Sequence, residues 1–273
     1  METRAETSCV VTGGARGIGR GIAELMVARG HRVVVTDVDG AAAAETAAEV
    51  GAAEGLAHDV RDPEGHRAAA EAAASYGVLT AWFNNAGVGD DGRLAEQSEE
   101  QVRRLVEVNL LGTMWGTRAA IDAFGEQGGD IVNTASLSGL CPVPGYAAYA
   151  ATKAAVVSLS ASVDLETPRR VRVHAVCPDV VQTAMLTEGH THDSLGSRLA
   201  HSGGRILTVE EVAREAVGLV GSNRVILSVP GWRGALVRAS GLAPSVSRHA
   251  LGLFELMGKR AIAKQERARL RGA

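Results

Sequence analysis

This chain of 273 residues carries a formal net charge of −3, and 46 % of its residues are hydrophobic while 22 % are charged. That length fits one well-buried α/β domain and is short for two. The weak acidity excludes nucleic acid as a partner of the chain as a whole, and no run approaches the ~18 apolar residues of a membrane-spanning helix. The three cysteines (Cys9, Cys141 and Cys177) are too few for a disulfide framework and lack metal-site spacing. Because the polar start holds no apolar signal region, we expect a reduced, cytoplasmic protein.

Short β-branched runs alternate along the chain with longer Ala-rich stretches of helical period. The predicted strands are Cys9–Thr12, Arg32–Thr36, Gly55–His58, Ala81–Asn84, Asp130–Thr134, Val171–Val176 and Val225–Ser228. Asp62 followed by Pro63 marks one helix start, and the capping boxes Ser98–Gln101 and Thr208–Glu211 mark two more. Strands with little polar alternation, separated by helices, indicate a parallel sheet covered on both faces. The predicted fold class is α/β: a Rossmann-type doubly wound parallel sheet in a single domain over residues 1–230.

A glycine-rich loop follows the first predicted strand. Its sequence is Thr12-Gly13-Gly14-Ala15-Arg16-Gly17-Ile18-Gly19, and a predicted helix begins directly after it. Glycines at such a place let the backbone turn tightly and approach a pyrophosphate, whose charge lies over the helix N-terminus. Asp37 comes 20 residues after Gly17, at the end of the second strand, where a carboxylate meets the ribose hydroxyls of adenosine. Together the two features predict a dinucleotide cofactor.

Tyr149 and Lys153 are four residues apart on a predicted helix, so their side chains share one face. A free tyrosine titrates near pH 10, and acid–base work near neutral pH needs that pKa lowered by about two units, roughly 2.7 kcal/mol. A lysine ammonium about 4 Å away supplies up to about 4 kcal/mol at an effective dielectric constant of about 20. Lys153 is also the single lysine before residue 259, although the chain has 28 basic residues. We therefore predict that Tyr149 is an acid/base whose pKa Lys153 lowers.

Ser136 supports this assignment from a third position. It follows the fifth predicted strand, 13 residues before Tyr149, at the carboxyl edge where doubly wound folds bind their ligands. Tyr146 is a rival phenol, but it lies seven residues from Lys153 and one step before the predicted helix. The alternative interpretation is that Tyr149 and Lys153 lie on a surface helix by chance, and the position of Ser136 argues against it.

At this point the chain resembles the short-chain dehydrogenase/reductase family over about residues 5–230. The resemblance rests on motifs in the family's order and spacing. They are the Thr-Gly-x-x-x-Gly-Ile-Gly loop from Thr12 to Gly19, Asp59-Val60, Asn84-Asn85-Ala86-Gly87, Asn109 in Val-Asn-Leu, Ser136, Tyr149 with Lys153, and Thr183. The function implied is an oxidoreductase that transfers a hydride between a nicotinamide cofactor and an alcohol or ketone carbon.

The resemblance also implies a role for each matching residue. Tyr149 is the expected general acid/base, Ser136 binds the substrate oxygen, Lys153 binds the nicotinamide ribose, and Asn109 holds a water in the proton relay. Asp59 is expected at the adenine, Asn85 beneath the cofactor cleft and Thr183 at the carboxamide. The implied cofactor-binding set, with no metal, is Gly13, Arg16, Gly17, Ile18, Gly19, Asp37, Asp59, Val60, Asn85, Ala86, Gly87, Tyr149, Lys153, Pro178, Val181 and Thr183.

Cofactor choice rests on two residues that disagree. A 2′-phosphate beside Asp37 adds like charge and costs a few kcal/mol at about 4 Å and a dielectric constant of about 20. Arg16 argues for NADP, since a basic residue in this loop often accompanies NADP use in relatives. We expect NAD, because Asp37 would lie directly against the phosphate while Arg16 can turn to solvent.

Pro178-Asp179 departs from the family, which usually has Pro-Gly there. The aspartate is expected to place a carboxylate near or over the substrate entrance. Two other functions fit part of the pattern. The presence of Ser136, Tyr149 and Lys153 argues against a non-catalytic dinucleotide-binding regulator, and a sugar-nucleotide epimerase would have a longer chain and another glycine spacing.

The substrate is expected to be a hydrophobic secondary alcohol or ketone. Mostly apolar residues precede the predicted catalytic helix or follow Thr183, and they either line the pocket or belong to the core: Leu137, Ser138, Leu140, Cys141, Val143, Tyr146, Met185 and Leu186. Residues 184–205 lack any helical or strand period, which predicts a substrate lid. The histidines of this segment (His190, His192 and His201) have no carboxylate or cysteine to complete a metal site.

The segment 231–273 is predicted to be a basic, helical C-terminal extension. It has nine Arg or Lys and two Glu, so it carries a net charge of +7 and leaves −10 on the rest. A helix over His249–Arg269 either packs on the domain or a neighbouring subunit, or lies weakly on an anionic membrane surface. We expect a homo-oligomer, a dimer or tetramer built as in relatives on the helices that carry Asn109 and Tyr149.

Overall fold

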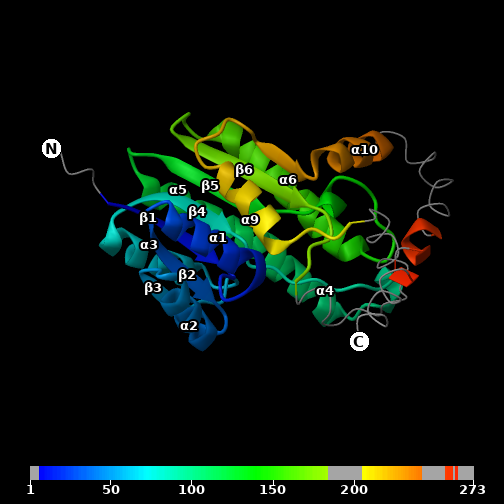
Figure 1. The fold of residues 1–273 in the computed structure, drawn as a ribbon. Helices are drawn as coiled ribbons and strands as arrows, with labels where there is room; N and C mark the ends of the chain where they lie inside the picture. The colour runs from blue at the N-terminus through cyan, green and yellow to red at the C-terminus, as the bar shows by residue number, and fades with distance from the viewer. Residues whose placement is uncertain (1–5, 184–204, 242–255, 261, 264–273) are drawn as a thin grey trace.

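A seven-stranded parallel sheet forms the centre of the protein in this computed structural model, which describes residues 6–183, 205–241, 256–260 and 262–263 (Figure 1). The strand order is β3-β2-β1-β4-β5-β6-β7. The strands are β1 (Thr7–Thr12), β2 (Arg32–Asp37), β3 (Glu54–Ala57), β4 (Val78–Asn84), β5 (Gly129–Thr134), β6 (Val171–Pro178) and β7 (Ile226–Val229). All seven predicted strands are confirmed, as is the doubly wound α/β class. The order reverses between β1 and β4, and a crevice at such a switch point is where doubly wound folds bind ligands.

The helices cover the sheet on both faces. They are α1 (Gly17–Ala28), α2 (Gly40–Val50), α3 (Pro63–Tyr76), α4 (Glu99–Leu105), α5 (Gly112–Phe124), α6 (Ala147–Glu166), α9 (Val209–Gly218) and α10 (Gly231–Gly241). Three shorter segments join them: the 3-10 turns η1 (Leu94–Glu96) and η3 (Leu137–Gly139), and the π-helical η2 (Val106–Leu111). The chain passes from α4 through η2 into α5 without a break.

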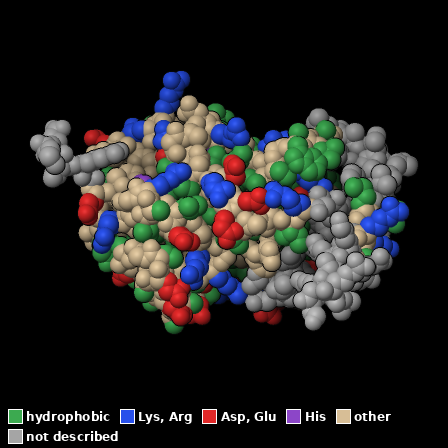
Figure 2. Space-filling model, viewed as in Figure 1, with side chains coloured by type: hydrophobic (Ala, Val, Ile, Leu, Met, Phe, Trp, Pro, Cys, Tyr) green, Lys and Arg blue, Asp and Glu red, His purple; other side chains and the backbone are tan. Residues whose placement is uncertain are grey.

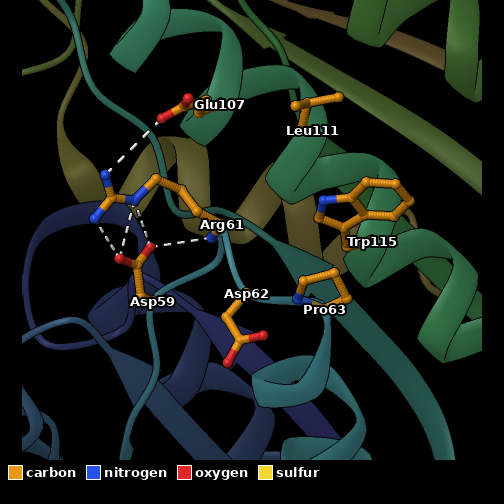
Figure 3. A pocket seen from close by; sticks show the side chains of 7 residues that line it. All are labelled: Asp59, Arg61, Asp62, Pro63, Glu107, Leu111 and Trp115. Carbon is orange, nitrogen blue, oxygen red and sulfur yellow. Dashed lines mark hydrogen bonds and ion pairs between the residues drawn. The ribbon is translucent and has the colours of Figure 1, made fainter.

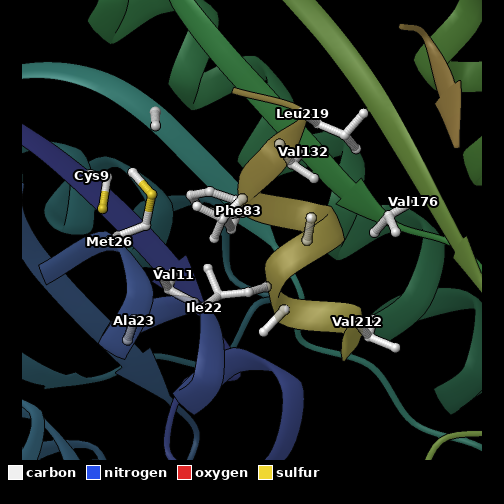
Figure 4. Close-up of a cluster of buried hydrophobic side chains, with 14 of the residues drawn as sticks. Cys9, Val11, Ile22, Ala23, Met26, Phe83, Val132, Val176, Val212 and Leu219 are labelled. Carbon is white, nitrogen blue, oxygen red and sulfur yellow. The ribbon is translucent and has the colours of Figure 1, made fainter. Parts of the chain in front are cut away.

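Two apolar layers hold the helices to the sheet. On the face of α1, α2 and α9, Ile22 and Met26 pack with Phe83 and Val212, as Figure 4 shows. The opposite face is covered by α3, α5 and α6, whose alanines and Phe124 surround Trp82. Small residues let the helices approach closely: a Cβ on Gly21 of α1 would lie 3.1 Å from the Ala213 side chain of α9.

Helix starts follow the predicted chemistry. Asp62 caps α3 with Pro63 in its first turn, and the capping boxes at Ser98 and Thr208 begin α4 and α9. Each cap accepts a hydrogen bond from a backbone N–H that the helix leaves without a partner. These local predictions are confirmed because capping depends only on residues close in the chain.

Helix α10 begins where the basic extension was predicted to start. Its Trp232 and Leu236 are 63 % and 47 % exposed, and Figure 2 shows hydrophobic side chains gathered over this helix. Over α1, α2 and α9 on the same face, acidic and basic side chains are interspersed. Residues 256–260 and 262–263 are helical. The rest of the predicted His249–Arg269 helix, and residues 184–204 of the predicted lid with its three histidines, lie outside the described residues.

In the described part of the chain, no helix combines the length and apolarity needed to cross a membrane. Nor do three side chains of His, Cys, Asp or Glu gather there as a metal site would require.

Candidate active site

The glycine loop between β1 and α1 has the backbone that a dinucleotide requires. Gly13 has φ +61°, and a Cβ there would lie 2.6 Å from the Ala86 Cα atom. A Cβ on Gly19 would collide with the Gly13 carbonyl oxygen. Gly17 has φ +57°, which an L side chain rarely adopts. The loop therefore accepts no side chains at these positions and brings its backbone close to the strand ends.

The first turn of α1 is open to an anion. Arg16, the N-cap residue, makes no side-chain capping bond, and no acidic residue lies in that turn. By contrast, side chains cap α2, α3, α4 and α9. The backbone N–H groups of α1 and the positive end of its dipole are thus left for a ligand. The residues present fit the pyrophosphate of a dinucleotide at this place.

Asp37 ends β2 beside the glycine loop. One carboxylate oxygen accepts a hydrogen bond from the Ala15 backbone N–H at 3.1 Å, and the other accepts one from the Asp39 N–H at 3.3 Å. Two fixed bonds orient the carboxylate toward the end of the sheet where adenosine is expected. The predicted placement of Asp37 next to the loop is confirmed.

Asp59 is held by an arginine that the sequence analysis did not single out. Its carboxylate accepts hydrogen bonds from Nε and Nη2 of Arg61, at 2.9 and 2.5 Å, and the Arg61 guanidinium keeps the pKa of Asp59 below its ordinary value. Glu107 lies 3.9 Å from Arg61 on the other side. These groups border a surface hollow of about 540 Å³ with Trp115, as Figure 3 shows. For Asp59 to bind adenine, it must share its carboxylate with Arg61.

Asn85 joins the glycine loop to the end of β4. Its amide nitrogen donates to the carbonyl oxygens of Thr12 and Gly13, at 3.1 and 3.0 Å. The Thr12 hydroxyl accepts from the backbone N–H groups of Asn85 and Ala86. Asn85 therefore fixes the glycine loop to the end of β4, and its support of a cofactor cleft stays a prediction.

Asn109 lies in the π-helical segment η2, and it is completely buried. Its side chain accepts a hydrogen bond from the Val88 N–H at 2.8 Å and donates to the Val88 carbonyl at 2.9 Å. Single π-helical turns inside α-helices are frequent at functional sites because they displace a side chain and a carbonyl from regular positions. A Cβ on Gly87 would lie 3.2 Å from Asn109 Oδ1 and 3.4 Å from Lys153 Nζ. Both polar side chains therefore lie close to Gly87.

Ser136, Tyr149 and Lys153 come together at the carboxyl end of β5. Lys153 is 4 % exposed, and its ammonium donates to the Thr134 carbonyl at 2.8 Å. It lies 5.8 Å from the centre of the Tyr149 ring. The Ser136 hydroxyl oxygen accepts hydrogen bonds from the Ser138 backbone N–H at 3.2 Å and from the Ser138 hydroxyl at 2.9 Å. The helix α6 places Tyr149 and Lys153 on one face, as their spacing predicted.

One expectation about this trio is wrong for the protein by itself. Burial raises the pKa of Tyr149 to about 12, and the hydrogen bond with Ser136 only partly opposes that rise. Burial also lowers the pKa of Lys153 to about 8. The lysine was expected to lower the tyrosine pKa, but its ammonium is directed at a backbone carbonyl and shares the same poorly solvated site. Further positive charge is needed to bring the phenol into a working range.

Tyr146 is the N-cap residue of α6, one step before the helix as predicted, with its ring centre 6.1 Å from that of Tyr149. Burial and the charge of Asp91 raise the pKa of the Tyr146 phenol. Leu137 is 5 % exposed and packs with Ala135 and Cys177. It therefore belongs to the core, whereas Cys141 and Tyr146 are half-buried and remain candidates for the pocket wall.

The segment after β6 runs beside the glycine loop. Val181 forms a bridge with Leu207, and a Cβ on Gly17 would lie 3.5 Å from the Thr183 methyl group. Pro178 ends β6, and Val60 lies under Gly112 on the other side of the cleft. Thr183 therefore lies near the glycine loop, while the binding roles inferred from the sequence for these residues stay predictions.

The carboxylate of Asp179 forms an ion pair with an arginine. Its Oδ2 atom lies 2.6 Å from Nε of Arg233 on α10, and both side chains are 11 % exposed. Sequence reasoning missed Arg233, because no local pattern links it to a partner so distant in the chain. The charge expected at the substrate entrance is neutralised.

The fold and this cleft define a dinucleotide-binding α/β protein, and comparisons with known proteins specify its family. The profile of the short chain dehydrogenase family matches residues 7–194. The chain is 37 % identical over 231 residues to 2,5-dichloro-2,5-cyclohexadiene-1,4-diol dehydrogenase of Sphingobium indicum, covering 81 % of this chain and 92 % of that protein. It is 39 % identical over 179 residues to sorbitol dehydrogenase of Cereibacter sphaeroides, covering 64 % and 70 %.

A solved structure of a short-chain dehydrogenase/reductase from Burkholderia phymatum in complex with NAD matches with a TM-score of 0.78 and 27 % identity, over 90 % of this chain and 96 % of that one. The protein belongs to the short-chain dehydrogenase/reductase family of oxidoreductases.

Proposed function

We propose that this protein is an NAD-dependent dehydrogenase that transfers a hydride between the nicotinamide ring and the carbinol carbon of a hydrophobic secondary alcohol, or the reverse from the ketone. One observation carries the proposal: the buried Lys153 and Asn109 both lie close to Gly87, and Lys153 is 5.8 Å from the ring centre of Tyr149, which like Ser136 is partly exposed. A regulator that only bound a dinucleotide would have no use for a partly exposed phenol with a serine and a lysine.

Tyr149 is the group that holds the proton in this scheme. In alcohol oxidation its phenolate oxygen takes the hydroxyl proton of the substrate, and in ketone reduction the phenol returns it. The Ser136 hydroxyl donates a hydrogen bond to the same substrate oxygen and keeps the reacting carbon in line. When bound, the cofactor accepts or supplies the hydride, and its oxidised ring adds positive charge near the phenol.

Lys153 and Asn109 assist the proton transfer of Tyr149 without contacting the substrate. The Lys153 ammonium orients the nicotinamide ribose and favours the phenolate through its charge. Asn109, which like Lys153 lies close to Gly87, holds a water through which the proton reaches solvent. The pKa of Tyr149 is raised in the protein without cofactor, so the phenol stays protonated until the positive charge of the oxidised cofactor is present. This fits a role for Tyr149 as the group that exchanges the proton with the substrate.

The substrate class is inferred from the weakly polar wall and from relatives. The dehydrogenase of Sphingobium indicum is named for a chlorinated cyclic diol, and that of Cereibacter sphaeroides for the polyol sorbitol. Of these, the apolar character of the loop from Leu137 to Tyr146 favours a cyclic, hydrophobic alcohol.

Purified protein incubated with NAD and a panel of cyclic secondary alcohols, the dichlorinated diol and sorbitol is expected to produce NADH, measured by its absorbance. Tyr149→Phe should reduce kcat by roughly a hundred- to ten-thousandfold while the Kd for NADH stays within about threefold. Tyr146→Phe is the matched control, since it removes a neighbouring phenol on the same helix start. A wild-type protein that binds NADH but oxidises nothing in the panel would favour the regulator, and greater damage from Tyr146→Phe would refute the assignment of Tyr149.

A further inference from the structure

Helix α10 packs against the catalytic end of the sheet. Its Val237 packs against the apolar cluster that contains Leu137, of the loop between Ser136 and Tyr149, and Cys177, next to the end of β6. The helix also starts close to the sheet, because a Cβ on Gly234 would collide with the Ser228 side chain of β7. The first three turns of the basic extension therefore pack on the cluster to which both segments contribute.

The Asp179–Arg233 ion pair fastens this helix at its first turn. The Nε–Oδ2 distance is 2.6 Å and little of either side chain reaches solvent. The Asp179 backbone N–H also donates to the Val229 carbonyl at 2.8 Å, so the aspartate is held from both its main chain and its side chain. Removing one partner of a pair this buried leaves an uncompensated charge, which is far more disruptive than the loss of an exposed pair.

Cys141 lies within reach of the charges of the Asp179–Arg233 ion pair. It belongs to the loop between Ser136 and Tyr149, and the charges of both Arg233 and Asp179 act on its thiol. Of the three cysteines, Cys9 and Cys177 are fully buried, whereas Cys141 is half-buried. The ion pair therefore lies near enough to the loop before α6 for its charges to act on Cys141.

We propose that Asp179 and Arg233 are a positioning pair that makes α10 a wall of the substrate side of the active site. Arg233 acts through Asp179: it fixes the loop that follows Pro178 and neutralises a carboxylate that would otherwise face the substrate. The wall then suits an uncharged substrate, and the catalytic unit extends past residue 230 to include α10. The kinetic part of this inference rests on the proposed function, whereas the placement of α10 does not.

Three variants test the pair. Arg233→Met removes the cation, Asp179→Arg with Arg233→Asp exchanges the two charges, and Arg67→Met breaks the exposed pair with Glu64 on α3 as a matched control. Each is compared with the parent protein for the rate at which a thiol reagent labels Cys141, for the Kd of NADH and for KM and kcat with the alcohol found above. Cys141→Ser gives the labelling background.

Arg233→Met is expected to accelerate labelling of Cys141 and to raise KM by about tenfold or more, with the Kd of NADH within about threefold. The exchanged pair should recover most of both losses, and Arg67→Met should match the parent. An unchanged labelling rate and KM in Arg233→Met, or no recovery in the exchanged pair while NADH still binds, would overturn the proposal. So would a Kd for NADH that rises in step with KM, since that indicates general loosening of the fold.

The labelling and NADH measurements need no substrate. If the parent oxidises no alcohol, the proposed function fails, yet faster labelling of Cys141 in Arg233→Met, reversed by the exchanged pair, still supports the placement of α10.

Discussion

The two ends of the cofactor cleft are built from different interactions. At the proposed nicotinamide end, Lys153 and Asn109 are almost fully buried, and both donate hydrogen bonds to backbone carbonyls. At the adenosine end, Asp59 and Arg61 form an ion pair near the surface, with Arg61 half exposed. Charges in the first region lie in a poorly solvated medium and act strongly on one another. Those in the second are screened by water and salt.

This contrast indicates what each end controls. A buried, hydrogen-bonded group cannot be replaced without leaving a neighbour unsatisfied, so its loss reaches the reaction directly. A half-exposed charge can be compensated by solvent, so its loss changes which ligand binds and how tightly. The nicotinamide end is therefore expected to govern rate and the adenosine end to govern cofactor choice.

Lys153→Met is the strongest test of the nicotinamide end. The variant loses the ammonium that orients the ribose and leaves the Thr134 carbonyl without its donor. We expect kcat/KM to fall by roughly a hundred- to a thousandfold, and the Kd for NADH to rise by about tenfold. Lys153→Arg keeps the charge but not the compact shape, and should recover only part of the loss. A rate within threefold of wild type in Lys153→Met would break the comparison.

Asp37→Ser tests whether the adenosine end selects the cofactor. Removing the carboxylate should tighten NADPH binding by roughly 30- to 100-fold, because the like charge beside a 2′-phosphate disappears. NADH should bind about tenfold more weakly, since hydrogen bonds to the ribose hydroxyls are lost. Fluorescence titration with each reduced cofactor measures both constants. Equal affinity of the wild-type protein for the two cofactors would show that Arg16 compensates for Asp37.

His58 sharpens the comparison, because it is a buried group under the exposed adenosine end. It is 5 % exposed, its Nδ1 lies 3.0 Å from the Thr36 hydroxyl, and its ring meets that of His66 edge-on at 4.3 Å. Burial, with a smaller contribution from His66, lowers the pKa of His58 from 6.5 to about 4. Between those values the unfolded chain binds a proton that the folded protein does not. Stability is therefore full above pH 6.5 and is lost as the pH falls toward 4.

The wild-type protein is expected to lose about 2 kcal/mol of unfolding free energy to His58 between about pH 7 and pH 5. Denaturant unfolding of wild type and His58→Gln at the two pH values measures it, and the variant should lack that portion of the loss. Parallel changes in the two proteins would show that His58 titrates normally. Activity near pH 7.5 should differ little between them, because His58 is neutral there.

Much of the fold was predictable from sequence because its signals are local. The β-branched runs indicated all seven strands, although β4 and β6 extend further than predicted, and Asp62, Ser98 and Thr208 marked helix starts correctly. Sheet order and register, by contrast, depend on which strands pair across the sheet. They followed from the sequence only through the general rules for doubly wound folds.

The candidate site divides in the same way. Spacing along the chain placed Gly13, Gly17 and Gly19 in the loop, and Tyr149 and Lys153 on one helical face. The direction of the Tyr149 pKa could not be obtained this way, because it depends on how deeply the phenol is buried and on where the lysine ammonium points. The four-residue spacing of Tyr149 and Lys153 places both side chains on one face of the helix, but it does not predict how far either is exposed to solvent.

The sequence by itself determined the fold class and the family, and it predicted the dinucleotide loop and the catalytic trio, because these signals lie in residues that are neighbours in the chain or follow a family spacing. Only the tertiary structure decided that Arg61 holds Asp59, that Asn109 and Lys153 both lie close to Gly87, and that Arg233 neutralises Asp179. The reason is physical: an ion pair forms wherever folding brings opposite charges within reach. No periodicity or cap in either segment records that α10 comes to lie against the end of β6.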